Sequence, residues 1–262
     1  MASTRLIASD LDGTLLRNDG SISPRTREAI RAAQAAGIAF AFVTARPPRQ
    51  IEQLAYSVGL TGLAVCSNGA ILYDLGRSLV VHHQALAPDI ARELVQMLRV
   101  ELPELAFAVE HGRSIARDTR FPALSGESSA AVSEIDAFLD DRLIKLLVHH
   151  PDHEAELLAA LVAKAVGIRG EVNHAGGPTF IEVSAAGVTK ATGLARLCSQ
   201  LKVTGSEVLA FGDMPNDLPM LSFAGRAIAV ANAHREVLAA AHEVTAANED
   251  DGVAQAIEAL LS

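Results

Sequence analysis

Two aspartates two positions apart follow a short apolar run near the start of the chain. Asp10 and Asp12 lie in the segment Asp10–Leu15, directly after Leu6–Ser9, which has the composition of a buried strand. Carboxylates at positions i and i+2 can point to one side of the loop that leaves a strand, so one can attack a substrate while the other moves protons. Mg²⁺ would join them, because it takes oxygen ligands and relieves the repulsion between like charges.

The alternative for Asp12-Gly13 is a hairpin turn, since Asp-Gly is a strong turn sequence between two strands. Three further apolar runs favour a reaction site, because each ends in polar residues suited to phosphate. In an open parallel sheet, ligands bind beyond the carboxyl ends of the strands, so these ends are expected to meet in one crevice. The runs are Ala39–Val43 before Thr44, Leu63–Cys66 before Ser67-Asn68-Gly69, and Val208–Phe211 before Gly212-Asp213.

The acidic residues suggest a division of labour in phosphoryl transfer. Asp10 is the candidate nucleophile, whose attack on a phosphoryl group gives an aspartyl phosphate. Asp12 is placed to protonate the departing alcohol and later to take a proton from water. Asp10, the backbone carbonyl of Asp12 and Asp213 would supply oxygen ligands to Mg²⁺. Asp217 is predicted to support the metal from the outer sphere.

Thr44, Lys190 and Asn216 are the candidate phosphate contacts. Thr44 offers a hydroxyl and a backbone amide, although an ordinary cap or loop threonine is the alternative. Lys190 is at the start of a predicted helix, where the helix dipole disfavours a cation, so another interaction should hold it there. A phosphate and Asp10 are the expected partners, and a solvated lysine is the alternative. Asn216 lies in Gly212–Asp217, which holds more polar residues than a helix cap needs.

The expected elements alternate between strand and helix in both end regions of the chain. Near-continuous apolar strands separated by helices predict an α/β fold with a doubly wound, mostly parallel, Rossmann-like core sheet. A hairpin is predicted over Ile71–Asp74 and Leu79–His82. The expected helices begin at Pro24, within Thr44–Pro48, and at about Thr189, Pro215, His234 and Asp251; the second of them closes at Gly59. The last expected strand is Ala227–Val230.

A different pattern occupies residues 84–183 and predicts an inserted α+β cap domain, leaving residues 1–83 and 184–262 as the core domain. Arg113–Ser133 carries too little periodicity for an assignment. The expected helices of the insertion are Pro88–Arg99 and Asp152–Val166, and its expected strands are Leu105–Glu110, Leu143–His149, Arg169–His174 and Thr179–Val183.

Composition indicates a globular chain with a full core. Half of the 262 residues are apolar and 20% are charged, and the net charge is −9 without a Lys/Arg block. These values argue against disorder and against nucleic-acid or membrane-surface partners. No apolar stretch approaches the ~20 residues of a membrane span, and the first five residues leave no room for a signal peptide. We therefore expect a cytoplasmic protein, with Cys66 and Cys198 as buried hydrophobic residues.

The four polar segments together resemble the haloacid dehalogenase (HAD) superfamily, in its Cof-type branch (subclass IIB), which has its larger cap between the second and third motifs. Asp10–Leu15 corresponds to the first motif, Thr44 to the second, Lys190 to the third and Gly212–Asp217 to the fourth. Two further segments, Asn68-Gly69-Ala70 and Asn248–Val253, also look like signatures of this branch.

The resemblance implies specific contacts. Arg46 is expected to face the substrate. The second motif usually reads Thr-Gly-Arg, and Ala45 replaces the glycine, which should narrow the pocket slightly and is costly only if the backbone needs a positive φ. The implied phosphate contacts are the backbone at Leu11, Thr44 with Ala45, Lys190 and Asn216, and the implied Mg²⁺ ligands are Asp10, Asp12 and Asp213.

The expected function is hydrolysis of a small organic phosphate monoester, such as a sugar phosphate or a phosphorylated cofactor, by a monomer or weak homodimer. A sugar phosphomutase and a phospho-receiver-like regulatory domain are the alternatives; Asp12 and the large insertion argue against the receiver. The inserted domain is expected to act as a lid that decides specificity. Its candidate contacts are His111, Arg113, Arg117 and His174, for which a solvated surface position is the alternative.

Overall fold

The computed structural model describes residues 3–124, 130–174 and 180–262, and the chain divides into two compact units. Unit 1 contains Met1–His82 and Thr189–Ser262, and unit 2 contains His83–Val188. The two end regions of the chain therefore fold together, and the middle region forms its own unit.

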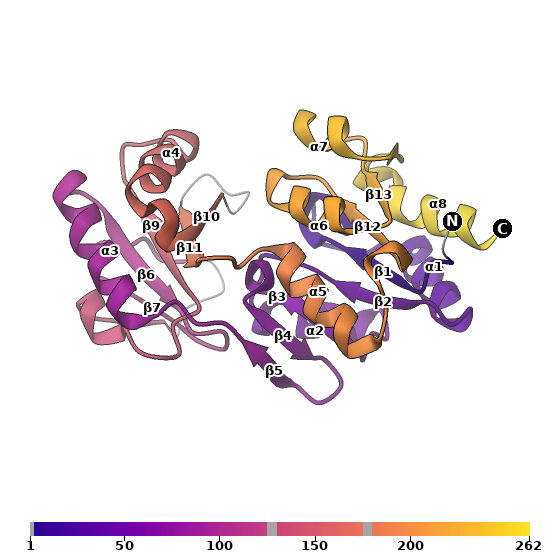
Figure 1. Cartoon of the computed structure of the whole chain (residues 1–262), viewed down its shortest axis with the longest axis horizontal. Coiled ribbons are helices and arrows are strands. Elements are labelled where there is room, and N and C mark those ends of the chain that lie inside the picture. Colours follow the sequence, from indigo (N-terminus) through magenta and orange to yellow (C-terminus); the bar gives the residue numbers. More distant parts are fainter. Residues whose placement is uncertain (1–2, 125–129, 175–179) are drawn as a thin grey trace. The chain divides into compact units, whose positions relative to one another are not determined.

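A parallel five-stranded sheet forms the centre of unit 1, with the strand order β14-β13-β12-β1-β2 (Figure 1). Ser9 and Phe211 are partners in the ladder between β1 and β12. The residues that follow these two strands therefore leave the sheet at the same edge. The strands are β1 Leu6–Ser9, β2 Ala39–Phe42, β12 Val208–Gly212, β13 Arg226–Ala229 and β14 Glu243–Val244.

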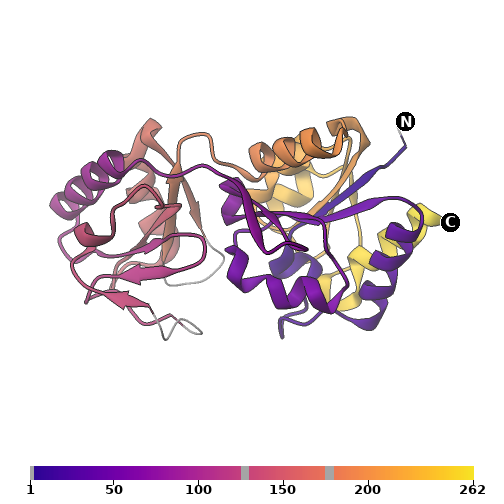
Figure 2. The same cartoon turned by 90° about the horizontal axis from the view of Figure 1, so that it is seen from below.

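Helices cover both faces of this sheet, with α5 on one face and the packed pair α1 and α8 on the other (Figure 2). The first helix begins where the sequence predicts it, because the Ser23 side chain accepts a hydrogen bond from the Thr26 backbone N–H and Pro24 takes the first helical position. The doubly wound α/β prediction is confirmed. The helices are α1 Pro24–Ala35, α2 Glu52–Ser57, α5 Lys190–Leu201, α6 Leu218–Phe223, α7 Arg235–Ala240 and α8 Gly252–Leu261.

A three-stranded sheet adjoins the edge of the core sheet at β2. Its order is β3-β4-β5, and a parallel bridge between Val43 and Val65 links β3 to the chain just after β2. The predicted hairpin is present as β4 and β5. The strands are β3 Leu63–Cys66, β4 Ile71–Asp74 and β5 Leu79–His83.

Unit 2 is a six-stranded sheet, β10-β11-β9-β6-β7-β8, with two helices on one face (Figure 1). Leu94 and Leu98 of α3 and Leu158 and Val162 of α4 pack with alternate residues of the central strands in one apolar core. The elements are α3 Pro88–Glu101, β6 Ala106–Glu110, β7 Ile115–Arg117, β8 Ala131–Val132, β9 Lys145–His149, α4 Ala155–Val166, β10 Gly170–His174 and β11 Ile181–Ala185.

The sequence did not predict the short strands β7, β8 and β14. The first two lie in the segment Arg113–Ser133, of which residues 125–129 are outside the described ranges. The predicted strand Thr179–Val183 corresponds to β11, and Thr179 is likewise outside the described residues.

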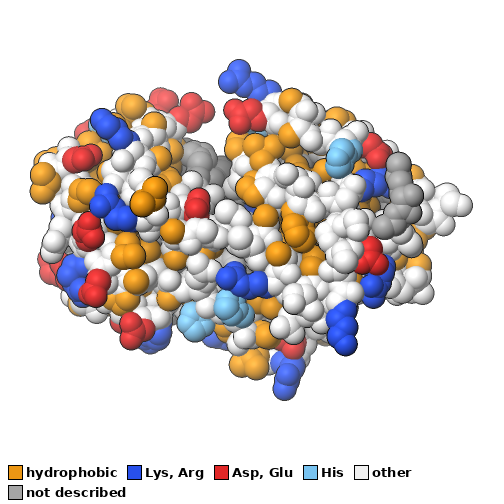
Figure 3. All heavy atoms as spheres, viewed as in Figure 1, with side chains coloured by type: hydrophobic (Ala, Val, Ile, Leu, Met, Phe, Trp, Pro, Cys, Tyr) orange, Lys and Arg blue, Asp and Glu red, His pale blue; other side chains and the backbone are white. Residues whose placement is uncertain are grey.

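Acidic and basic side chains are interspersed on the face drawn in Figure 3, and the described residues of that face form no block of Lys and Arg. In the three described stretches of the chain, no helix combines the length and apolar character needed to cross a membrane.

Candidate active site

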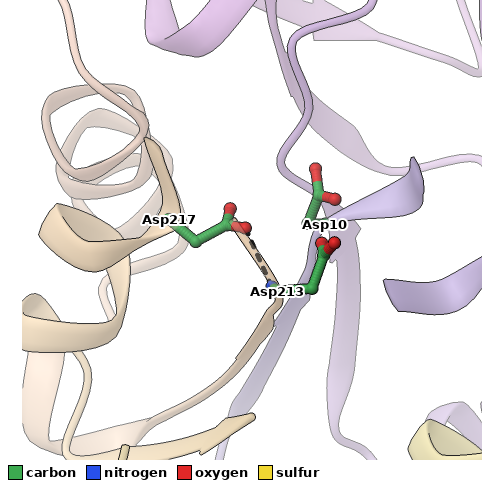
Figure 4. A group of neighbouring side chains, drawn as sticks. All are labelled: Asp10, Asp213 and Asp217. Atoms are coloured by element: carbon green, nitrogen blue, oxygen red, sulfur yellow. Dashed lines mark hydrogen bonds between the residues drawn. The ribbon is translucent and has the colours of Figure 1, made fainter. Parts of the chain in front are cut away.

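Four charged side chains from three separate segments meet at the carboxyl edge of the parallel sheet. Asp10 follows β1, Asp213 and Asp217 lie in the turn after β12, and Lys190 is the first residue of α5. Carboxylate oxygens of the three aspartates lie within 4.8 Å of one another, and Figure 4 shows how the side chains converge. All four residues are buried. The residues that follow β1 and β12 therefore lie together, as the sequence predicted.

Lys190 bridges two of the carboxylates. Its Nζ donates hydrogen bonds to Asp10 Oδ1 and Asp217 Oδ1, each at 2.6 Å. Burial alone would lower the pKa of Lys190, but the Asp10 and Asp217 carboxylates outweigh it and raise that pKa above its ordinary value. Thr189 and Thr192 form a capping box that starts the helix at this lysine. Lys190 is therefore a charged, buried side chain, and the solvated-lysine alternative is wrong.

The cluster holds more negative charge than one lysine neutralises. Burial raises the pKa of Asp10 well above its usual value, against the attraction of Lys190, and the Asp217 carboxylate raises it further. Burial also raises the pKa of Asp213 to about 6, against the hydrogen bond from Thr14. Three close carboxylates with excess negative charge are a donor set that fits Mg²⁺, which prefers oxygen ligands and would neutralise that charge.

Asp217 has a wider role than the predicted outer-sphere support of a metal. Its Oδ2 accepts hydrogen bonds from the backbone N–H groups of Asp213 and Met214, both at 3.0 Å, while Oδ1 accepts from Lys190. A Cβ atom at Gly212 would lie 2.6 Å from Asp217 Cβ, so this turn needs glycine. Asp217 thus fixes both the turn that carries Asp213 and the ammonium group of Lys190.

The first acidic loop closes directly onto Asp213. The Thr14 hydroxyl donates to Asp213 Oδ1 at 2.7 Å, and a Cβ at Gly13, whose φ is +79°, would lie 2.4 Å from Asp213 Oδ2. Leu11–Leu15 forms a tight loop with non-helical backbone angles at Asp12 and Gly13, closed by the Leu16 N–H, which donates to the Leu11 carbonyl at 2.8 Å. Leu11 is buried, and β1 pairs in parallel with β12 and β2. The hairpin interpretation of Asp12-Gly13 is therefore wrong.

Asp12 lies apart from the buried cluster and is paired with Arg46. Its side chain is 58% exposed, and Arg46 donates to its two carboxylate oxygens, from Nε at 2.9 Å and from Nη2 at 2.5 Å. The hydrogen bonds to Asp12 raise the pKa of Arg46. The sequence did not predict this contact, because the partners are 34 positions apart and no local pattern joins them.

Thr44 is buried just after β2. The sequence predicted that its backbone amide could bind an anion, but this amide is already paired within the protein. That N–H donates to the Val65 carbonyl at 2.9 Å, because the chain here still pairs with β3. The Thr44 hydroxyl accepts from the Arg46 N–H at 3.1 Å and keeps its own O–H as a donor. Ala45 is not among the described residues with positive φ, so its methyl group carries no backbone strain.

Three asparagines outside the four motifs, Asn68, Asn232 and Asn248, also join these loops. Asn216 Nδ2 donates to Asn68 Oδ1 at 3.2 Å. Asn232 Nδ2 donates to the Gly13 carbonyl, and Asn232 Oδ1 accepts from the backbone N–H of Asn248. Asn248 Nδ2 also donates to the carbonyl of Leu16, so the segment before α8 is fastened to the first acidic loop. The sequence indicated Asn68 both as one of the polar residues after a strand end and as part of a family signature, and it indicated Asn248 as part of a family signature.

Two of the candidate cap contacts make hydrogen bonds within unit 2. His111 Nε2 lies 3.0 Å from the Phe138 carbonyl oxygen, and Arg117 donates to the Phe121 carbonyl at 2.8 Å. The side chain of His174 is outside the described part of the structure.

Comparison with known proteins identifies the family of this chain. The model of the haloacid dehalogenase-like hydrolase family matches residues 7–257. The 5-amino-6-(5-phospho-D-ribitylamino)uracil phosphatase YcsE of Bacillus subtilis is 30% identical over 97% of this chain and 94% of its own. The pyridoxal phosphate phosphatase YbhA of Escherichia coli is 27% identical over 97% of both chains. The solved structure of the HAD subclass IIB sugar phosphatase BT4131 shares the fold, with a TM-score of 0.83 at 22% identity over 98% of both chains. The resemblance seen in the motifs is thus confirmed, and the chain belongs to the haloacid dehalogenase-like hydrolases.

Proposed function

We propose that this protein is a Mg²⁺-dependent phosphatase that hydrolyses a small organic phosphate monoester through an aspartyl phosphate on Asp10. The observation that carries the proposal is the buried cluster of Asp10, Asp213, Asp217 and Lys190 at the ends of β1 and β12. The two relatives compared above support it, because both are phosphatases of small phosphorylated compounds.

In the first step, a carboxylate oxygen of Asp10 attacks phosphorus and the bond between phosphorus and the ester oxygen breaks. Asp12 gives its proton to the departing alcohol oxygen. Asp12 suits proton transfer because its side chain is largely exposed. The two hydrogen bonds from Arg46 orient its carboxylate form, which is the form that takes a proton in the second step. Lys190 places a permanent positive charge beside Asp10 and offsets the negative charge of the phosphoryl oxygens.

In the second step, Asp12 takes a proton from a water molecule as that water attacks phosphorus, and the bond to Asp10 breaks to release inorganic phosphate. The proposed phosphate contacts are the Leu11 backbone, the Thr44 hydroxyl, Ala45, Lys190 and Asn216. Mg²⁺, held by Asp10, the Asp12 carbonyl and Asp213, would supply further positive charge at the phosphoryl group, with Asp217 in support.

The leaving group is proposed to be a sugar or an organic cofactor, in keeping with the substrates named for the two relatives. Residues 84–183 are proposed to act as the cap that selects this group. We further propose that the protein works in the cytoplasm as a monomer or weak homodimer.

A substrate panel tests the proposal. Purified protein is assayed with sugar phosphates, pyridoxal phosphate, flavin mononucleotide and p-nitrophenyl phosphate, with and without chelator. We expect phosphate release that stops on chelation and returns with Mg²⁺. Isomerisation of a hexose phosphate without phosphate release would indicate a mutase, and a long-lived phosphoenzyme with negligible turnover would indicate a receiver. Full activity after thorough chelation would contradict the metal site.

A further inference from the structure

The turn after β3, Ser67–Gly69, touches the segments that carry three of the proposed phosphate contacts. The backbone N–H of Ser67 donates to the Arg46 carbonyl, and that of Asn68 donates to the Thr44 carbonyl, both at 3.0 Å. The side-chain carbonyl of Asn68 accepts from Asn216 at 3.2 Å. The four motifs of the proposed reaction do not include this turn.

The same turn packs directly against the start of α5. A Cβ at Gly69 would lie 2.0 Å from the Thr189 carbonyl oxygen, and a Cβ at Gly193 would lie 2.6 Å from Gly69 Cα. Two glycines in contact therefore let the turn approach the helix turn that carries Lys190. Asn68 thus lies where the segments of Thr44, Lys190 and Asn216 come together.

The backbone of this turn is held in an unfavourable conformation. Ser67, Asn68 and Gly69 have φ values of +51°, +55° and +102°, so two non-glycine residues in succession are left-handed. Both are buried, and Ser67 Oγ has no hydrogen-bond partner among the described residues. Strain of this kind persists only where the surrounding structure imposes it, and it is concentrated at functional sites.

We propose that Asn68 is a positioning residue for phosphate binding, a role that rests on the function proposed above. Its side-chain carbonyl holds the amide of Asn216, and its backbone holds the Thr44 loop. Asn68 therefore keeps the groups that contact phosphate at a fixed separation without taking part in the chemical steps.

A double-mutant cycle on Asn68→Gly and Asn216→Ala tests this role. Glycine accepts the left-handed backbone, so Asn68→Gly removes the side-chain contact and keeps the turn. Lys202→Gly is the matched control, because Lys202 is also left-handed, with φ +55°, and is exposed at the end of α5. The readouts are kcat/KM with p-nitrophenyl phosphate, inhibition by inorganic phosphate, and the ¹⁵N signal of the Asn216 side-chain amide.

We expect Asn68→Gly to weaken phosphate inhibition and lower kcat/KM about tenfold, the upper end of the effect of losing one partly buried hydrogen bond. It should also shift the Asn216 amide signal, and the double variant should be no worse than Asn216→Ala alone. Lys202→Gly should match the wild type in all three measurements.

Three results would each overturn the positioning role and leave the phosphatase assignment intact. The first is that the losses of the two single variants add in the double variant. The others are wild-type phosphate inhibition in Asn216→Ala and wild-type behaviour of Asn68→Gly. Wild-type protein that neither hydrolyses esters nor binds phosphate would overturn both. If Asn68→Gly does not fold, Asn68→Ala replaces it, because alanine also lacks the side-chain carbonyl that accepts from Asn216. Unchanged phosphate inhibition in Asn68→Ala would then reject the proposal.

Discussion

Each unit of the molecule buries a lysine among acidic side chains, but in different places. In unit 2, Lys145 pairs with Glu182 inside the antiparallel sheet and lies opposite Glu110 in the ladder of β6 and β9. In unit 1, Lys190 lies at the sheet edge, where β1 and β12 have already ended, between Asp10 and Asp217. The first cluster is part of a regular sheet, and the second is built from loops and a helix start.

The surroundings of the two lysines indicate different roles: Lys145 stabilises the sheet of unit 2, whereas Lys190 lies where a reaction can take place. At the sheet edge a third carboxylate, Asp213, is added, and burial raises the pKa values of both Asp10 and Asp213. A site that keeps uncompensated negative charge out of water is poised for a cation, and perturbed pKa values of this kind are concentrated at functional sites. Substitutions in the cluster around Lys190 should therefore change activity, and those in the cluster around Lys145 should change stability.

The largest effect is expected for Asp10→Asn. Removal of the nucleophile should lower kcat by at least about 10⁴-fold and abolish any trapped phosphoenzyme. The melting temperature should not fall, because the substitution removes a carboxylate whose charged form is disfavoured by burial. Steady-state kinetics and calorimetry check this, and near-normal turnover would remove Asp10 from the nucleophile role.

Lys145→Met should have the opposite profile. It leaves Glu182 buried without its ammonium partner and should lower the free energy of unfolding by about 3–5 kcal/mol. Below the melting temperature kcat should stay within about twofold of the wild-type value, because Lys145 is buried in the sheet of unit 2 and takes no part in the proposed chemical steps. Chemical denaturation measures the loss, and the double variant Lys145→Met/Glu182→Leu should regain most of it. A large fall in kcat for folded protein would show that the two clusters are coupled.

Asp12→Asn should lower kcat about 10²–10³-fold through loss of general acid and base catalysis. Stability should change by no more than about 0.5 kcal/mol, because this side chain is largely exposed. The control is Asp89→Asn, which removes an exposed carboxylate paired with Arg92 and should leave kinetics unchanged. If Asp12→Asn were as active as Asp89→Asn, another group would have to move the proton.

The smallest expected effect is the pH dependence of stabilisation by Mg²⁺. Burial raises the pKa of Asp213 to about 6, so without metal the folded protein favours the protonated side chain. The stability that this preference contributes is fully present below about pH 4 and is lost as the pH rises through 6. Mg²⁺ needs the ionised carboxylate, so its stabilising effect should grow over the same interval, reaching about 1.4 kcal/mol at ten times its Kd. Thermal shift assays at pH 5 and 7.5 measure this, with Asp213→Asn as the control. An equal shift at both pH values would exclude Asp213 as a ligand.

Most regular elements follow from local sequence features. Leu6–Ser9 and Leu63–Cys66 are strands as predicted, and the helix at Lys190 begins at a Thr189 cap. Apolar periodicity, caps and turn residues involve only a few neighbouring positions, so they can be recognised in a single sequence. Short strands such as β8 and β14, of two residues each, contain too few residues to show a period.

The contacts among site residues were only partly predictable. The dipole argument at Lys190 anticipated its contact with Asp10, which is 180 positions away. No such argument linked Asp12 to Arg46, or Asn68 to Asn216 across 148 positions. The availability of the Thr44 amide was predicted wrongly, because it depends on the bridge between Val43 and Val65.

The sequence by itself determined the parallel α/β core and the acidic segments at its strand ends, since hydrophobic patterning and strand-end chemistry are local properties. The tertiary structure alone decided that Asp10 and Asp213 are buried with Lys190 while Asp12 stays exposed beside Arg46. Burial and pairing set the charge state of each carboxylate, and both depend on which distant segments pack around it.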